Sequence, residues 1–167
     1  MCANKIISVS LSGSLSVGGQ RIAEWQFADW SCAASVDAEL AIAKPFTTSS
    51  GTSFDLDNRG ELAGKVVLMG RDTASLQARA RAAQDAGAVG VIFANNDKAK
   101  PDAADELIVN DLRDELTVDV PVVMVSFNSG DRAKSLGPGT TVAFTGPSCG
   151  HCSVVSHLMR GRCSYRR

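Results

Sequence analysis

The sequence is poor in histidine, and this scarcity excludes several classes of enzyme. Its 167 residues contain two histidines, His151 and His157, both close to the carboxyl terminus. A Ser-His-Asp hydrolase needs an imidazole to take the proton from the serine hydroxyl, and zinc peptidases generally bind their metal through imidazole nitrogens. Neither arrangement can be assembled from residues 1–148. We therefore expect the body of the chain to be non-enzymatic and to need no cofactor.

Aromatic residues and long apolar runs are also scarce. Aromatics make up 5% of the chain, so a core must be built mainly from Val, Ile, Leu and Ala. No run approaches the roughly 18 consecutive apolar residues that a membrane helix needs. The net charge of −1 argues against a dedicated nucleic-acid-binding protein. The length and the 44% hydrophobic content are those of one ordinary globular domain.

The amino terminus lacks the solid apolar stretch of a signal peptide. Ile7, Val9 and Leu11 alternate with serines, which is the period of a β-strand. No cleavage site of the small-x-small type follows promptly. Neither a signal peptide nor a membrane helix is predicted, so the sequence assigns no compartment.

The clearest pattern is a strand, a helix and a second strand within residues 64–96. Residues 66–68 and 90–94 are short β-branched runs typical of buried strands. Between them, Leu76, Ala80, Ala83 and Gly87 recur at helical spacing and form one narrow stripe of mostly small residues. This pattern predicts a βαβ unit whose helix lies close to the sheet. We expect Asp72 or Thr73 to cap the start of the helix, and Gly87 to take a left-handed conformation at its end.

Several further elements surround this unit. We expect strands within residues 6–17, 25–30, 39–43, 120–126 and 141–145, and a short helix over 131–136. Residues 47–58 are rich in Ser, Thr, Gly and Asp and predict a loop. Strands outnumber helices, and the first strands all precede the βαβ unit. The fold class predicted is α+β, a strand-rich open barrel or sandwich flanked by two helices.

The order of these motifs resembles that of the protease-associated (PA) domain, a non-catalytic module found within or beside proteases, sorting receptors and ubiquitin ligases. The resemblance spans roughly residues 38–145. The matching positions are the strand 64–69, Arg71, the helix residue Arg79, the triplet 86–88, the strand 91–93 with Asn95 and Asn96, and the strand 120–126. Each piece alone is generic, and the order carries the resemblance.

The resemblance implies an organisation and a function. Residues 1–37 would supply strands that pack on the PA-like domain of residues 38–146. The domain would recognise protein or peptide segments, or act as a lid or spacer beside another domain. The expected binding positions are Arg71, Asp72, Asn95 and Asn96, in the loops that follow the two central strands. Alternatively, the chain is a fragment of a larger PA-containing peptidase or ubiquitin ligase, and relatives of this kind are usually lumenal or extracellular.

Three residues depart from the family pattern. Asp72 stands where the family usually has glycine, Ala74 where it often has cysteine, and Leu76 where it has phenylalanine. The stretch around Pro45 also has no cysteine, so both halves of the disulfide that the resemblance implies are absent. Leu76 is a tolerable change of volume in a core. The departures leave the expected fold intact but argue against an oxidising setting.

The carboxyl-terminal tail, residues 147–167, differs in composition from the rest of the chain. Residues 149–167 hold four arginines and no acidic residue, and we expect the tail to be disordered. Two alternatives remain open, a redox pair or a zinc knuckle that contacts nucleic acid. The redox pair would be Cys149 and Cys152, although too little chain follows for a thioredoxin domain. The zinc ligands would be Cys149, Cys152, His157 and Cys163.

Overall fold

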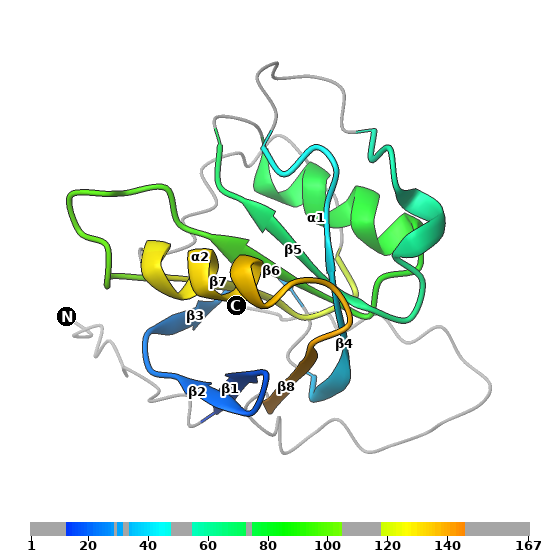
Figure 1. The fold of residues 1–167 in the computed structure, drawn as a ribbon. Helices are drawn as coiled ribbons and strands as arrows, with labels where there is room; N and C mark the ends of the chain where they lie inside the picture. The colour runs from blue at the N-terminus through cyan, green and yellow to red at the C-terminus, as the bar shows by residue number, and fades with distance from the viewer. Residues whose placement is uncertain are drawn as a thin grey trace, which may run out of the picture.

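A mixed sheet of eight strands organises the chain (Figure 1). The computed structural model describes residues 13–28, 30–31, 34–47, 55–72, 75–104 and 118–145. The strands are β1 Ser14–Val17, β2 Gln20–Ile22, β3 Trp25–Phe27, β4 Val36–Ile42, β5 Val66–Gly70, β6 Gly90–Ala94, β7 Val122–Val125 and β8 Thr141–Thr145. The helices in these residues are α1 Leu76–Asp85, α2 Phe127–Leu136 and a short 3₁₀ turn, η1 Arg59–Glu61.

The sheet curls until its two edges approach each other. The strand order is β2-β1-β8-β4-β5-β6-β7-β3, with β4 to β7 parallel and the other pairs antiparallel. The two edge strands, β2 and β3, are joined by only Ala23 and Glu24, so the sheet is nearly closed. This confirms the predicted α+β class with a barrel-like sheet and two helices. The unit β5-α1-β6 at its centre has parallel strands in register from Val66 opposite Gly90 to Gly70 opposite Ala94.

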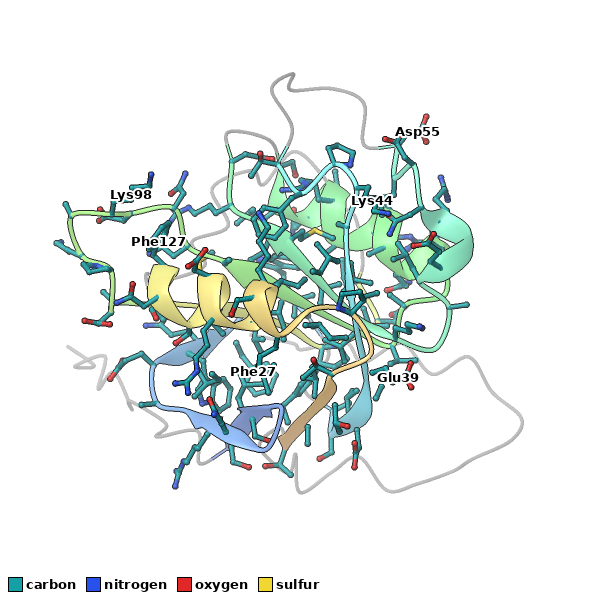
Figure 2. All side chains as sticks on the ribbon, in the orientation of Figure 1. Phe27, Glu39, Lys44, Asp55, Lys98 and Phe127 are labelled. Atoms are coloured by element: carbon teal, nitrogen blue, oxygen red, sulfur yellow. The ribbon has the colours of Figure 1, made fainter. Side chains whose placement is uncertain are left out.

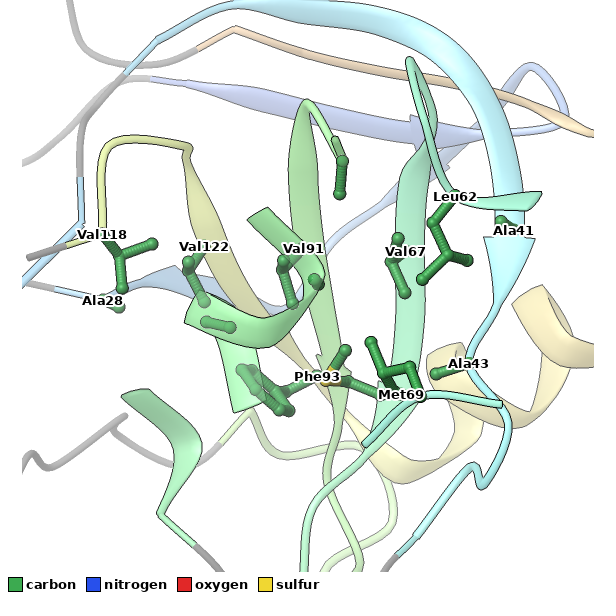
Figure 3. Packing of buried hydrophobic residues seen from close by; sticks show 14 of the residues in the cluster. Ala28, Ala41, Ala43, Leu62, Val67, Met69, Val91, Phe93, Val118 and Val122 are labelled. Atoms are coloured by element: carbon green, nitrogen blue, oxygen red, sulfur yellow. The ribbon is translucent and has the colours of Figure 1, made fainter. Parts of the chain in front are cut away.

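Successive residues of the parallel strands point to opposite faces of the sheet, which creates two cores. Val67, Met69, Val91 and Phe93 belong to one core, which α1 covers through Ala80 and Ala83 (Figure 3). The other core fills the inside of the curled sheet and meets α2 through Ala133. Its members from the parallel strands are Leu40, Val66, Leu68, Ile92, Ala94, Val123 and Val125. Both faces of the strands are buried, as is usual for parallel sheets.

The predicted stripe of small residues does face the sheet, but the cap of α1 differs from the prediction. Ala80 and Ala83 are fully buried, and Gly87 follows the helix with a φ of 87°. Ser75 is the N-cap, and its side chain accepts a hydrogen bond from the backbone N–H of Ala78 at 3.3 Å. The prediction that Asp72 or Thr73 caps the helix was wrong. The Asp72 carboxylate instead forms an ion pair with Arg79.

Helix α2 is longer than predicted. It begins at Phe127 rather than Asp131, with Ser126 as N-cap accepting from the backbone N–H of Ser129 at 3.2 Å. Its first turn contains Asn128, Ser129 and Gly130, which are poor helix formers, so local propensity gave no signal. Gly130 is required by packing, because a Cβ at this position would overlap the Cβ of Ala94 on β6.

Two of the amino-terminal strands have other bounds than predicted, since β3 ends at Phe27 rather than residue 30 and β4 begins at Val36 rather than residue 39. Gly18 and Gly19 make the turn of the β1–β2 hairpin with φ values of 59° and 75°, and β2 was not predicted. β1 also pairs with β8, and β3 pairs with β7, so both ends of the described chain lie within the sheet. The part of the first predicted strand that precedes Gly13 lies outside the described residues. No helix among the residues described is long and apolar enough to cross a membrane.

Candidate functional site

The loops that follow β4, β5 and β6 are held side by side by backbone hydrogen bonds. The N–H of Gly70 donates to the carbonyl of Phe46 at 2.8 Å, and the N–H of Arg71 donates to that of Ala94 at 2.8 Å. The N–H of Asn95 donates to the carbonyl of Val125 at 3.0 Å. These bonds extend the ladder of the sheet beyond the carboxyl ends of its strands. The loop positions predicted for binding therefore start from a fixed backbone.

A hollow of about 190 Å³ lies above this ladder, between the loop ends and α2. Three of the four predicted binding residues, Arg71, Asn95 and Asn96, line it. Phe46, Phe127 and Lys134 also line it, from the segment after β4 and from α2. The floor lies over Gly70, where a Cβ would approach Thr47 Cγ2 to 2.5 Å and Phe46 Cε1 to 2.8 Å. A side chain at position 70 would therefore clash with two residues that line the hollow.

Asn95 organises the turn after β6. Its side chain is buried, and its Oδ1 accepts hydrogen bonds from the N–H groups of Asn96 at 2.8 Å and Asp97 at 3.4 Å. The same oxygen accepts from Arg71 Nη1 at 3.3 Å, while Nδ2 donates to the carbonyl of Ala103 at 3.2 Å. The amide of Asn95 therefore fixes the turn and orients Arg71. Asn96, in contrast, is exposed at the rim.

Two phenylalanine rings and Lys134 line the hollow, and Lys98 contacts one of these rings from outside the lining. Lys134 Nζ lies 4.3 Å from the centre of the Phe46 ring. Lys98 Nζ lies 5.8 Å from the centre of the Phe127 ring, and Figure 2 shows Phe127 at the start of α2 with Lys98 on the loop beside it. Such cation–π contacts contribute about 0.5–1 kcal/mol at exposed sites. Asp131 is the acidic member of the lining. The hollow therefore combines half-buried aromatic walls with a rim of charged groups.

Asp72, the fourth predicted residue, lies below the hollow rather than at its rim. Its carboxylate is 2.8 Å from Nη1 of Arg79, and the side chains of Asp72 and Arg79 are 8% and 1% exposed. Arg79 also donates to the carbonyls of Gly70 and Phe46, the latter at 2.9 Å. Burial lowers the pKa of the Arg79 guanidinium, and the charge of Asp72 opposes this shift.

The sequence analysis did not identify Phe46 and Lys134 as residues that line the hollow. Phe46 and Lys134 reach the hollow from segments distant in sequence, and no motif marks either of them. Arg79 did carry a signal, since it lies three residues after Leu76 and therefore near the buried face of the helix. Its interaction with Asp72 could have been suspected from that placement.

A second, wider hollow of about 560 Å³ lies where the edge strands β2 and β3 meet. Arg21, Trp25, Gln26 and Phe27 line it. It adjoins Gly13, which follows directly on residues that are not described. The smaller hollow is the better candidate because predicted loop residues, aromatic walls and charges converge on it.

The structure offers no metal site among the residues that it describes, where no group of three or more His, Cys, Asp or Glu side chains converges. The alternative zinc ligands Cys149, Cys152, His157 and Cys163 lie outside the described residues, as does the predicted disorder of the tail. The zinc and redox alternatives therefore stay predictions.

The fold resembles that of several peptidases of known structure. BSAP, a zinc aminopeptidase from Bacillus subtilis, is 24% identical with a TM-score of 0.56, covering 83% of this chain and 31% of that one. An aminopeptidase from Aneurinibacillus sp. strain AM-1 is 20% identical with a TM-score of 0.54, covering 81% of this chain and 30% of that one. A peptidase M28 precursor from Shewanella amazonensis SB2B is 13% identical with a TM-score of 0.53, covering 81% and 34%. The chain thus spans about a third of the length of each of these structures.

Sequence comparison identifies the family. No curated protein matches the chain. A family model described as PA domain matches residues 31–133, which is more than half of the chain and includes β4 to β7 with α1 and most of α2. The chain therefore belongs to the PA domain family.

Proposed function

We propose that this domain is a non-catalytic protein-interaction module that binds an extended peptide segment in the hollow beyond β5 and β6. The observation that carries the proposal is the convergence of Arg71, Asn95 and Asn96 with the rings of Phe46 and Phe127 on one hollow. Phe127 comes from α2, and the other four residues come from segments that follow strands of the sheet, which is the usual arrangement of a recognition surface.

The size and chemistry of the hollow suit one side chain and its backbone. Pockets for small ligands and cofactors occupy roughly 300–1,000 Å³, whereas this hollow has about 190 Å³. An apolar side chain could lie between the two phenylalanine rings, while polar groups of the same peptide meet Arg71 and the exposed amide of Asn96. A peptide bound in this way needs no cofactor and undergoes no reaction.

The absence of histidine from residues 1–148 supports a non-catalytic role for the domain. The similar folds within aminopeptidases support a second part of the proposal, in which the domain serves as a lid or spacer within a larger peptidase. The two roles are compatible, because a peptide-binding module can deliver a segment to a neighbouring catalytic domain. Transcript sequencing across both ends of the reading frame would test the second part.

The binding proposal predicts that Arg71→Ala weakens peptide binding while the melting temperature stays within a few degrees of wild type. The probe is a phage-displayed library of random linear peptides, selected on the purified chain. The affinity of enriched peptides is then measured by fluorescence anisotropy. Arg132→Ala, which removes an exposed arginine of α2 outside the hollow, is the matched control and should bind normally.

Two outcomes would contradict the binding proposal. The first is a library that enriches no sequence at all. The second is a set of enriched peptides that bind Arg71→Ala and Asn96→Ala as tightly as wild type. A large loss of stability in Arg71→Ala with unchanged peptide affinity would show that Arg71 has a structural role instead.

A further inference from the structure

The buried ion pair between Arg79 and Asp72 stands out in a helix that otherwise covers the sheet with small residues. The Arg79 side chain is 1% exposed and that of Asp72 is 8% exposed. Arginine is almost never fully buried unless it is paired. A buried ion pair generally stabilises a fold no better than apolar residues of the same volume. Net stability therefore does not explain why this pair is present.

The contacts of Arg79 indicate a different role. Its guanidinium binds three separate groups at once, namely the carbonyl of Gly70, the carbonyl of Phe46 and the carboxylate of Asp72. Its Cζ lies over the Phe93 ring, 5.9 Å from the ring centre. The planar fork of an arginine can hold several acceptors in fixed directions, which a lysine ammonium cannot do.

All three acceptors belong to segments that build the candidate site. Phe46 and Gly70 line the hollow, and Asp72 directly follows Arg71. The carbonyl of Phe46 accepts two hydrogen bonds, from the N–H of Gly70 at 2.8 Å and from Arg79 Nη2 at 2.9 Å. Arg79 therefore lies beneath the hollow and ties its Phe46 wall to the turn that carries Arg71.

We propose that Arg79 and Asp72 are a positioning pair that sets the shape of the hollow, with Asp72 orienting the guanidinium and Arg79 holding the Phe46 wall against Gly70. Neither residue touches the peptide. The consequence for peptide binding rests on the proposed function, whereas the consequence for the shape of the hollow does not. The pair thus connects the buried face of α1 to the hollow at the carboxyl ends of β5 and β6.

The same helix provides a matched control. Arg81 Nε and Asp85 Oδ1 also lie 2.8 Å apart, but their side chains are 36% and 47% exposed. The two pairs have the same residue types and the same shortest distance, and they differ in burial and in their contacts with the hollow. The variants Arg79→Lys and Asp72→Asn can therefore be compared with Arg81→Lys and Asp85→Asn.

The first readout is native-state hydrogen exchange, which needs no ligand. The N–H of Gly70, which bonds to Phe46, should exchange about tenfold faster in Arg79→Lys, since a hydrogen bond from a charged group is lost. The N–H of Asn95, which bonds to Val125 and not to the Phe46 segment, is the internal control and should follow global stability only. The Arg81→Lys and Asp85→Asn variants should change neither amide.

The second readout is the affinity for peptides selected on the wild-type chain. Arg79→Lys and Asp72→Asn should each weaken it about tenfold, as expected when the orientation of a recognition group is lost, and the two effects should not add because the residues act together. If Arg79→Lys fails to fold, Asp72→Asn still tests the proposal, since it keeps the arginine and an acceptor oxygen.

The outcomes separate this proposal from the proposed function. Unchanged exchange at Gly70 in both buried-pair variants, relative to Asn95, would overturn the positioning role. Unchanged peptide affinity despite faster exchange at Gly70 would overturn the predicted consequence for binding, because the hollow would then recognise peptides without this support. If wild type selects no peptide but Gly70 responds as expected, the positioning role stands and the proposed function fails.

Discussion

Helices α1 and α2 are built alike and yet serve different purposes. Each has ten residues, each begins after a serine whose side chain accepts from the third backbone N–H, and each is followed by a glycine with positive φ. They pack against opposite faces of the central strands. α1 seals its face with Ala80 and Ala83 and contributes a buried arginine. α2 approaches the sheet through Gly130 and turns Asp131 and Lys134 toward the hollow.

The comparison shows that the two helices contribute differently, since α1 mainly covers a core of the sheet and α2 also lines the hollow. The face of α1 toward the sheet carries the buried Gln77 and also Arg79, whose hydrogen bonds reach the carbonyls of Phe46 and Gly70. Gly130 lets α2 pack closely against Ala94 of β6, and at this distance Asp131 and Lys134 of α2 line the hollow. Substitutions of the alanines of α1 should therefore act mainly through stability, whereas substitutions of Arg79 and of residues on α2 should also change the shape of the site.

The largest effect is expected from Arg79→Met. Breaking a buried ion pair by removing one partner costs about 3–5 kcal/mol, because the other charge is left unpaired. Urea denaturation measures the loss, and Arg81→Met should lose at most about 0.5 kcal/mol as an exposed pair. Adding Asp72→Ala to Arg79→Met should recover part of the loss. Equal losses for Arg79→Met and Arg81→Met would break the distinction between the two pairs.

A smaller effect is expected from Gly130→Ala. Glycine to alanine within a helix normally stabilises by about 0.5–1 kcal/mol, but here the new Cβ overlaps Ala94. Overpacking of this kind costs about 1–3 kcal/mol, so the sign should be reversed. Gly60→Ala is the control, because a Cβ there meets nothing within 4 Å. A stabilised Gly130→Ala protein would show that α2 does not pack this closely.

The smallest effects concern the caps. Ser75→Ala should cost about 1 kcal/mol, the usual value for a lost N-cap. Ser126 is 2% exposed, so Ser126→Ala should cost more, up to about 2 kcal/mol, because water cannot replace the bond. Thermal denaturation of both variants, with the exposed Ser135→Ala as control, would measure the difference. A larger loss for Ser75→Ala would reverse the expected order.

Elements could be predicted from the sequence where the pattern of apolar residues matches the burial of those residues in the fold. The strand at Val66–Gly70 was predicted from a continuous β-branched run, which suits burial on both faces. The alanine stripe of α1 and Thr141–Thr145 were predicted because each has a period that matches its buried face. β2 and the first turn of α2 were missed. β2 is a three-residue strand held by its hairpin partner, and Gly130 is placed in a helix by contact with Ala94, which no local pattern encodes.

The site was predictable in part, for a similar reason. Arg71, Asn95 and Asn96 follow strand ends, and the parallel register brings them together. Phe46 and Lys134 come from distant segments and join them only through the tertiary fold. Asp72 was expected at the rim because its neighbours lie there, whereas the buried charge of Arg79 draws its carboxylate inward.

The contact between Arg79 and the carbonyl of Phe46 also bears on the missing cysteines. The resemblance to PA domains implies a sulfur bridge between the stretch around Pro45 and the turn at position 74, and this chain has neither cysteine. Arg79 instead joins the Phe46 segment to the end of β5 through hydrogen bonds, and through an ion pair to Asp72. A link of this kind forms without an oxidant and is not cleaved by thiols. We therefore expect this link between the Phe46 segment and β5 not to depend on the redox potential around the protein.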